Sequence, residues 1–334
     1  MIAFVARLSG LRHVTERCGY FLNTANFSSL SHALRRVSSL TFVRRLVAIV
    51  ESTHEPVAGE LVAVDGMALS LPATQRHNMK KMNNKTVGGG VVWMWMIESA
   101  SGMSPVKLLK TIRGAWHDTT VARETQLASN GPIYLMDRGF YALDLVERWI
   151  TDTVHFIVRA RERCLHHEVL RHLSAARAIG KKKKLLLDAV ARLGAASAKA
   201  RPTVRLVIAQ LASGEKLILV TDLMDRTAEE ILAAYAKRWH VERFHNFLKD
   251  ALGLAHLYSF DQTGAEFLLL TALLTAMLLV LSDDAPAGET IVIARRALRV
   301  LRSLLGLAKP WRRNCCTRGR QKKTAREKAQ TLKR

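Results

Sequence analysis

The sequence is poor in cysteine, in acidic residues and in long apolar runs. Its four cysteines show no paired spacing of metal ligands, and the adjacent Cys315 and Cys316 lack the two-residue gap of a zinc site. These cysteines are typical of reduced thiols in a cytosolic protein. The apolar run 267–281 covers 15 residues, whereas a bilayer span needs about 20. This run therefore predicts a buried core helix and not a membrane helix.

The shortage of acidic residues leaves a large positive charge. There are 51 Lys and Arg residues against 28 Asp and Glu, so the formal net charge is +23. Such a surplus favours a polyanion as partner, because each neutralised phosphate releases condensed counterions. A basic protein without a nucleic-acid partner, and one that binds an acidic membrane surface, are open alternatives. Residues 295–334 contain 15 basic residues and one acid and are predicted to form a disordered polybasic arm.

Two short apolar runs end on an aspartate. The run 61–64 is followed by Asp65 and a glycine, and the run 133–136 is followed by Asp137 in the sequence Asp-Arg-Gly. Each pattern predicts a buried strand that delivers an acid into a turn. Taken alone, each aspartate could serve only the turn.

Strand and helix patterns alternate through the middle of the chain. Further strands are predicted at 91–97, 106–112 and 154–158, with a hairpin at 203–220 and helices at 119–128 and 142–150. One or two basic amphipathic helices are predicted at 28–52, and the alanine-rich basic segment 161–201 is predicted to be helical. The alternation indicates an α/β domain whose first three strands form a meander.

A helix with one polar stripe is predicted after residue 227. Thr227 and Glu230 match a capping box, which places the start of the helix near Ala228. Four polar residues on this helix recur at spacings that put them on one stripe: Tyr235, Arg238, Glu242 and Lys249. The opposite side holds Val241, Phe244 and Leu248, which are predicted to face the core. The stripe is compatible with ordinary surface ion pairing and equally with a phosphate held beside a metal ligand.

Three carboxylates of this kind suit phosphodiester chemistry. Cleavage and strand transfer use two divalent ions roughly 4 Å apart, one at the attacking oxygen and one at the leaving oxygen. Mg²⁺ prefers oxygen ligands and keeps several waters, so two or three carboxylates are sufficient. Asp65 and Asp137 at the carboxyl ends of neighbouring strands would meet this need together with Glu242.

At these residues the sequence resembles a known family, the DDE-class insertion-sequence transposases of the insertion-sequence-four type. Their third acid lies in a Tyr-Arg-Glu-Lys motif, which residues 235–249 (YAKRWHVERFHNFLK) match at every position. Two further blocks also resemble the family: DGMALSLP from Asp65 and DRGFY from Asp137, the second followed by the strand FIVR. The resemblance covers roughly residues 58–283.

The resemblance implies an α/β fold with a ribonuclease H-like core that is interrupted by a β-containing insertion and flanked by helices. The core would comprise residues 57–160 and 221–285, and the insertion subdomain residues 161–220. Residues 1–56 would form a short N-terminal helical region, with a truncated DNA-binding domain as an open alternative, and residues 286–334 a basic C-terminal helix and tail.

The resemblance also implies the site and its partners. Asp65, Asp137 and Glu242 would bind two Mg²⁺ or Mn²⁺ ions, and Tyr235, Arg238 and Lys249 would hold DNA phosphates. The partner would be double-stranded DNA, both the terminal inverted repeats of an element and its target, bound by a homodimer. We expect a bacterial cytoplasmic protein that is associated with the nucleoid and does not bind a membrane.

Two other functions and one residue pair stay open. A truncated, non-catalytic DNA-binding remnant that inhibits a full-length relative would share the basic surface, and a ribonuclease H-like nuclease could cleave without joining. His117 and Asp118 could form an acid–base pair near the site, but a loop-to-helix N-cap is the preferred interpretation.

Overall fold

The structure is a computed structural model. It describes residues 36–52, 57–69, 80–82, 85–87, 90–99, 102–110, 117–180, 183–246, 248–249 and 262–281. The predicted basic C-terminal region 286–334 and the first 35 residues of the chain lie outside these ranges.

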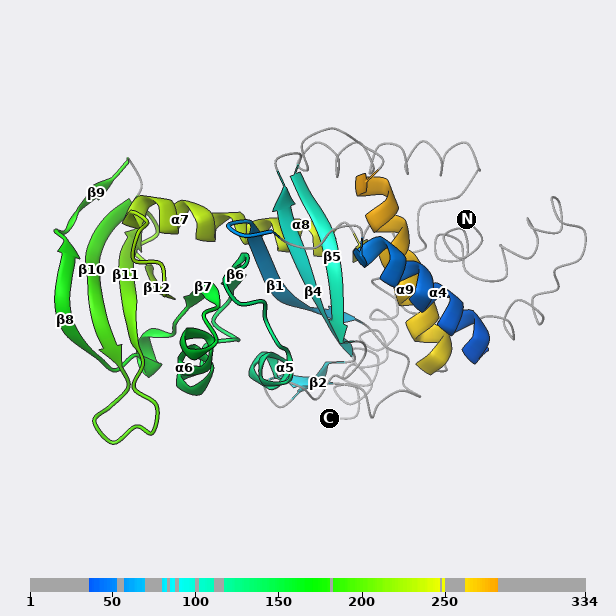
Figure 1. Ribbon diagram of the computed structural model, residues 1–334, viewed down its shortest axis with the longest axis horizontal. Helices are drawn as coiled ribbons and strands as arrows, with labels where there is room; N and C mark the ends of the chain where they lie inside the picture. Colours follow the sequence, from blue (N-terminus) through cyan, green and yellow to red (C-terminus); the bar gives the residue numbers. More distant parts are fainter. Residues whose placement is uncertain are drawn as a thin grey trace, which may run out of the picture.

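A ten-stranded mixed sheet runs through the molecule (Figure 1). Its strands are β1 (Leu61–Leu69), β4 (Gly90–Ser99), β5 (Gly102–Lys110), β6 (Ile133–Met136), β7 (His155–Arg159), β8 (His167–Ser174), β9 (Arg177–Ile179), β10 (Lys183–Leu193), β11 (Thr203–Leu211) and β12 (Lys216–Thr221). A separate two-stranded sheet consists of β2 (Lys80–Met82) and β3 (Lys85–Val87).

The sheet order is β5-β4-β1-β6-β7-β12-β11-β10-β8, with β9 paired to β10. Strands β5, β4 and β1 are antiparallel neighbours, which confirms the predicted meander. Strands β1, β6 and β7 are parallel, and the remaining neighbours are antiparallel. The predicted α/β class is confirmed, and the predicted hairpin is β11 and β12.

Helices cover both faces of the sheet (Figure 1). On one face, α5 (Asp118–Glu124) and α6 (Leu143–Thr151) pack on side chains such as Val62 and Tyr134. On the other, α7 (Ala228–Lys237), α8 (Trp239–Asn246) and α9 (Gln262–Leu281) pack on side chains such as Ala63 and Leu135. Adjacent residues of one strand thus serve opposite layers, as the two-residue period of a strand requires. The predicted helix 142–150 is confirmed, and the one predicted at 119–128 ends earlier, at Glu124.

The apolar segment 267–281 belongs to helix α9, which packs in the core. Ala265, Leu269 and Leu273 are buried there, and α4 (Val37–Ser52) lies against the same helix through Leu40 and Val43. No helix in the described part of the chain is long and apolar enough to cross a membrane. The prediction of a buried core helix is confirmed.

The prediction of a helical segment at 161–201 is wrong, because these residues form the strands β8, β9 and β10. The cause is tertiary pairing: β10 hydrogen-bonds to β11 on one side and to β8 and β9 on the other. On β10, Ala189, Ala191 and Leu193 are buried at a two-residue period. Alanine favours helices, but such a preference is small per residue and burial overrides it.

A buried ion pair ties these strands to the chain that enters α7. The guanidinium of Arg205 on β11 donates to both oxygens of Asp188 on β10, over 2.9 and 3.1 Å. It also donates to the carbonyl oxygens of Leu223, Met224 and Arg226, in the loop that precedes α7. Ser174 Oγ donates to Asp188 over 2.7 Å. The start of α7 is therefore fixed from the β-rich side of the sheet.

The predicted capping box begins α7. Thr227 Oγ1 accepts the N–H of Glu230 over 3.2 Å, and the Glu230 carboxylate accepts the N–H of Thr227 over 2.7 Å. The predicted long helix is divided, because α7 ends at Lys237 and α8 begins at Trp239. Arg238, between them, keeps helical backbone angles, so the direction of the chain is preserved.

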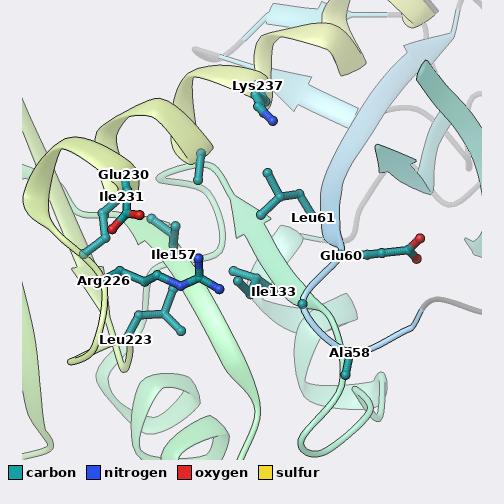
Figure 2. A pocket seen from close by; sticks show the side chains of 12 residues that line it. Ala58, Glu60, Leu61, Ile133, Ile157, Leu223, Arg226, Glu230, Ile231 and Lys237 are labelled. Atoms are coloured by element: carbon teal, nitrogen blue, oxygen red, sulfur yellow. The ribbon is translucent and has the colours of Figure 1, made fainter. Parts of the chain in front are cut away.

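A cavity of about 680 Å³ lies between α7 and the sheet (Figure 2). Its lining includes Leu61 and Ile133, the first residues of the parallel strands β1 and β6, together with Arg226 and Lys237. The cavity is therefore at the amino ends of these strands. The aspartates of the predicted site lie toward the opposite ends.

Candidate active site

The parallel pairing of β1 and β6 brings Asp65 and Asp137 side by side. The register pairs Leu61 with Ile133 and continues to Val64 with Met136. The next residue on each chain is one of the two aspartates. Neighbouring strands are about 4.8 Å apart, so equivalent positions on them are close.

One part of the prediction for Asp65 is wrong. Asp65 does not enter a turn, because β1 continues to Leu69 and pairs with β4 as far as Gly90. The pairing partner of Asp65 is Met94, so the acid projects from the interior of a strand. Asp137 does precede a turn, as predicted: the carbonyl of Asp137 accepts the N–H of Phe140 over 2.9 Å.

Helix α8 brings Glu242 to the same place, and Arg238 connects it with Asp65. Arg238 Nη2 lies 3.0 Å from Glu242 Oε1, and Nη1 lies 3.5 Å from Asp65 Oδ2. The side chain of Arg238 is only 9% exposed, whereas those of Asp65 and Glu242 are 21% and 33% exposed. Two of the three predicted acids thus share one guanidinium, and the charge of the third, Asp137, also acts on Arg238.

Asp65 is in an unfavourable environment for a charged group. The pKa of Asp65 is raised from 3.8 to about 6, chiefly by burial and to a lesser extent by the negative charges of Asp137 and Asp118. The N–H of Gly66, which donates to Asp65 Oδ1 over 2.8 Å, and the charge of Arg238 act in the opposite direction. The protein therefore concentrates negative charge where burial disfavours it.

The remaining polar residues of the stripe lie at different depths. Tyr235 is buried, and its ring is 5.9 Å from the guanidinium carbon of Arg238. Burial raises the pKa of Tyr235 to about 12. Lys249 is half-buried, and burial together with the charges of Lys249 and Arg238 lowers the pKa of the neighbouring His245 to about 3. The predicted core side of the helix is confirmed, since Val241, Phe244 and Leu248 are fully buried.

Asp118 belongs to this neighbourhood, which the preferred sequence interpretation missed. Asp118 is the first residue of α5; the N-cap is His117, whose side chain makes no capping hydrogen bond. The Asp118 carboxylate lies against Gly139, two residues after Asp137. The glycine of the Asp-Arg-Gly sequence, Gly139, is the one feature of the sequence that could have indicated this contact. Nothing in the sequence, however, connects Gly139 with a residue 21 positions earlier.

The donor set fits a divalent cation of the Mg²⁺ type. Asp65, Asp137 and Glu242 offer carboxylate oxygens, the ligands that Mg²⁺ prefers. Among the residues that the structure describes, no three acidic, histidine or cysteine side chains are already arranged around one point.

Comparisons with known proteins agree on one class of protein. The family model described as "Transposase DDE domain" matches residues 58–278. The probable transposase for insertion sequence element IS5377 of Geobacillus stearothermophilus is 25% identical over 190 residues, which are 56% of this chain and 48% of the relative. The chain thus spans about half the length of that relative.

A solved structure is also similar in part. The cryo-EM structure of a piggyBac transposase synaptic complex with hairpin DNA aligns with 77% of this chain and 56% of its own, at 10% identity and a TM-score of 0.40.

Proposed function

The chain belongs to the transposase DDE domain family, and from this premise we propose that it cleaves DNA strands at the ends of an insertion sequence and transfers them to a target. The proposed class is the one whose third acid lies in a Tyr-Arg-Glu-Lys motif. One observation carries the proposal: two aspartates on adjacent parallel strands lie beside a glutamate from α8, and an arginine links that glutamate to Asp65.

The order of the sheet supports the ribonuclease H-like core. An antiparallel meander, β5-β4-β1, is extended by two strands parallel to β1, and helices cover both faces. On this reading, the core comprises residues 57–160 and 221–285. Residues 161–220 are the insertion, whose strands continue the sheet from the edge of β7. Arg205, which is paired with Asp188 in the insertion, also donates to carbonyl oxygens of the loop that precedes α7, and α8 with Glu242 follows α7.

Asp65, Asp137 and Glu242 would hold the divalent ions. Bound there, Mg²⁺ or Mn²⁺ would activate the attacking oxygen and stabilise the charge on the leaving oxygen. The contribution of the protein is a rigid frame: Asp65 is fixed by strand pairing on both sides of β1, and the N–H of Gly66 holds one of its oxygens. Glu242 is fixed by the packing of Val241 and Phe244 beneath it.

Arg238 has two successive partners in this proposal. Without DNA, its guanidinium neutralises Asp65 and Glu242. A divalent ion at these carboxylates would compete with it, and the released guanidinium suits a DNA phosphate, which accepts two parallel hydrogen bonds. Lys249 would add a second positive charge for the backbone of the same strand, and Tyr235 a hydroxyl. The net charge of +23 favours DNA as the partner.

The proposal is tested with purified full-length protein, Mg²⁺ and DNA that carries the terminal repeats of the element. We expect nicks at the ends and, with a target plasmid, joined products. The variant Asp137→Ala should lose nicking and joining but keep the non-specific DNA binding of the parent. Asp225→Ala, an exposed acid in the loop before α7, is the matched control and should cut as the parent does. Equal cutting by Asp137→Ala and the parent would refute the assignment of the site.

A further inference from the structure

Asp118 and Gly139 are in unusually close contact. A Cβ atom placed on Gly139 would lie 2.1 Å from Oδ2 of Asp118 and 3.1 Å from its Cγ. Only a residue without a side chain therefore allows the carboxylate to lie against the turn that follows Asp137. This contact joins the first turn of α5 to the chain beyond β6, although the two segments belong to different elements.

The carboxylate of Asp118 lies against the turn that follows Asp137, in addition to standing in the first turn of its own helix. An acid in the first turn commonly stabilises its own helix through the helix dipole. Here the carboxylate also lies against Gly139, two residues after Asp137. Asp118 thus places a negative charge beside the turn that follows Asp137.

We infer that Asp118 is a positioning residue of the active site, a fourth carboxylate that strengthens divalent-ion binding by Asp65 and Asp137. It acts in two ways. Its contact with Gly139 fixes the turn that orients Asp137, and its charge makes the site more attractive to a cation. Carboxylates that surround metal ligands commonly act in this way. The inference rests on the proposed function, because it assumes that Asp65 and Asp137 hold the ion.

Two variants separate charge from position. Asp118→Asn keeps the size of the side chain and removes its charge. Gly139→Ala keeps the charge, but its methyl group displaces the carboxylate, which sits at the movable end of a side chain. The control is Asp144→Asn, the corresponding change in the first turn of α6, where the carboxylate pairs with exposed Arg123.

The measurement is binding of Mn²⁺ to the DNA-free full-length protein by titration calorimetry, with thermal unfolding recorded in parallel. We expect Asp118→Asn and Gly139→Ala each to weaken Mn²⁺ binding, by about tenfold, and Asp144→Asn to leave it unchanged. The double variant should be weakened less than the product of the two single effects, because both act through one carboxylate.

Two results would overturn the inference. One is parental Mn²⁺ affinity in folded Asp118→Asn, which would reduce Asp118 to a stabiliser of its helix. The other is full additivity in the double variant. The variant Asp65→Asn distinguishes a failure of the proposed metal site from a failure of the role inferred for Asp118. If it weakens Mn²⁺ binding strongly while Asp118→Asn does not, the proposed function stands and only the role of Asp118 is refuted. If Asp65→Asn also binds as the parent does, the metal site itself is wrong.

Discussion

Replacing Asp65 by asparagine should stabilise the metal-free protein while it destroys the proposed activity. The pKa of Asp65 is raised from 3.8 to about 6, mainly by burial. A carboxyl group with a folded pKa above its unfolded pKa contributes stability at pH values below 3.8. That contribution is lost as the pH rises toward 6, because the unfolded chain then ionises more easily. Above pH 6, the folded protein carries the full cost of the buried charge.

The magnitude follows from the pKa difference. The difference is about two pH units, and each unit corresponds to about 1.4 kcal/mol, so the cost at pH 7.5 is about 3 kcal/mol. The side chain is only 21% exposed, so solvent screening does not remove this cost. Asparagine has the size of the protonated acid without its charge. Asp65→Asn should therefore gain up to about 3 kcal/mol at pH 7.5 and only about 1 kcal/mol at pH 4.5.

The assay is urea unfolding of parent and variant in the presence of a chelator at both pH values. Asp225→Asn, which changes an exposed acid with a long 3.9 Å ion pair, is the control and should leave the free energy of unfolding nearly unchanged. An unchanged stability of Asp65→Asn at pH 7.5, or an equal gain at both pH values, would refute the electrostatic reasoning.

Two further predictions concern arginine side chains of the protein. Asp188→Asn should lower the free energy of unfolding by about 3–5 kcal/mol in urea titrations, because it leaves Arg205 buried without its counter-charge; a loss below about 1 kcal/mol would contradict this. Arg238→Ala should bind Mn²⁺ more tightly than the parent without DNA, since a competing cation is removed from Asp65 and Glu242. The same variant should bind DNA ends with a salt dependence shallower by about one ion, and an unchanged slope would remove Arg238 from the phosphate contacts.

The sequence predicted most of what positions the site. Apolar runs that end on Asp65 and Asp137 predicted adjacent strands, and the register confirms that the two acids are neighbours. Glu242 could be located because capping and helical spacing are local properties of the chain. The core side of α8 followed from the same spacing.

The failures concern contacts between distant segments. Asp65 lies within β1 because β4 pairs with β1 from Leu61 to Leu69. The sequence of neither strand alone indicates that β1 continues beyond Asp65. The alanine-rich segment 161–201 became strands because β11 offers an edge to β10. Asp118 was interpreted as part of a local cap, whereas its position depends on the missing side chain of Gly139.

Metal binding by the three carboxylates is tested by cleavage of DNA in which sulfur replaces one non-bridging oxygen of the phosphate at the element end. If carboxylates of this site hold an ion that contacts that phosphate, the parent should cut the sulfur-substituted DNA poorly with Mg²⁺, which prefers oxygen. Mn²⁺, which accepts sulfur more readily, should restore cutting. Asp137→Ala should cut neither DNA with either metal. Sulfur can replace either of the two non-bridging oxygens. If neither replacement slows cleavage in Mg²⁺, or if the DNA is cut in the presence of a chelator, these carboxylates do not hold an ion that contacts the phosphate.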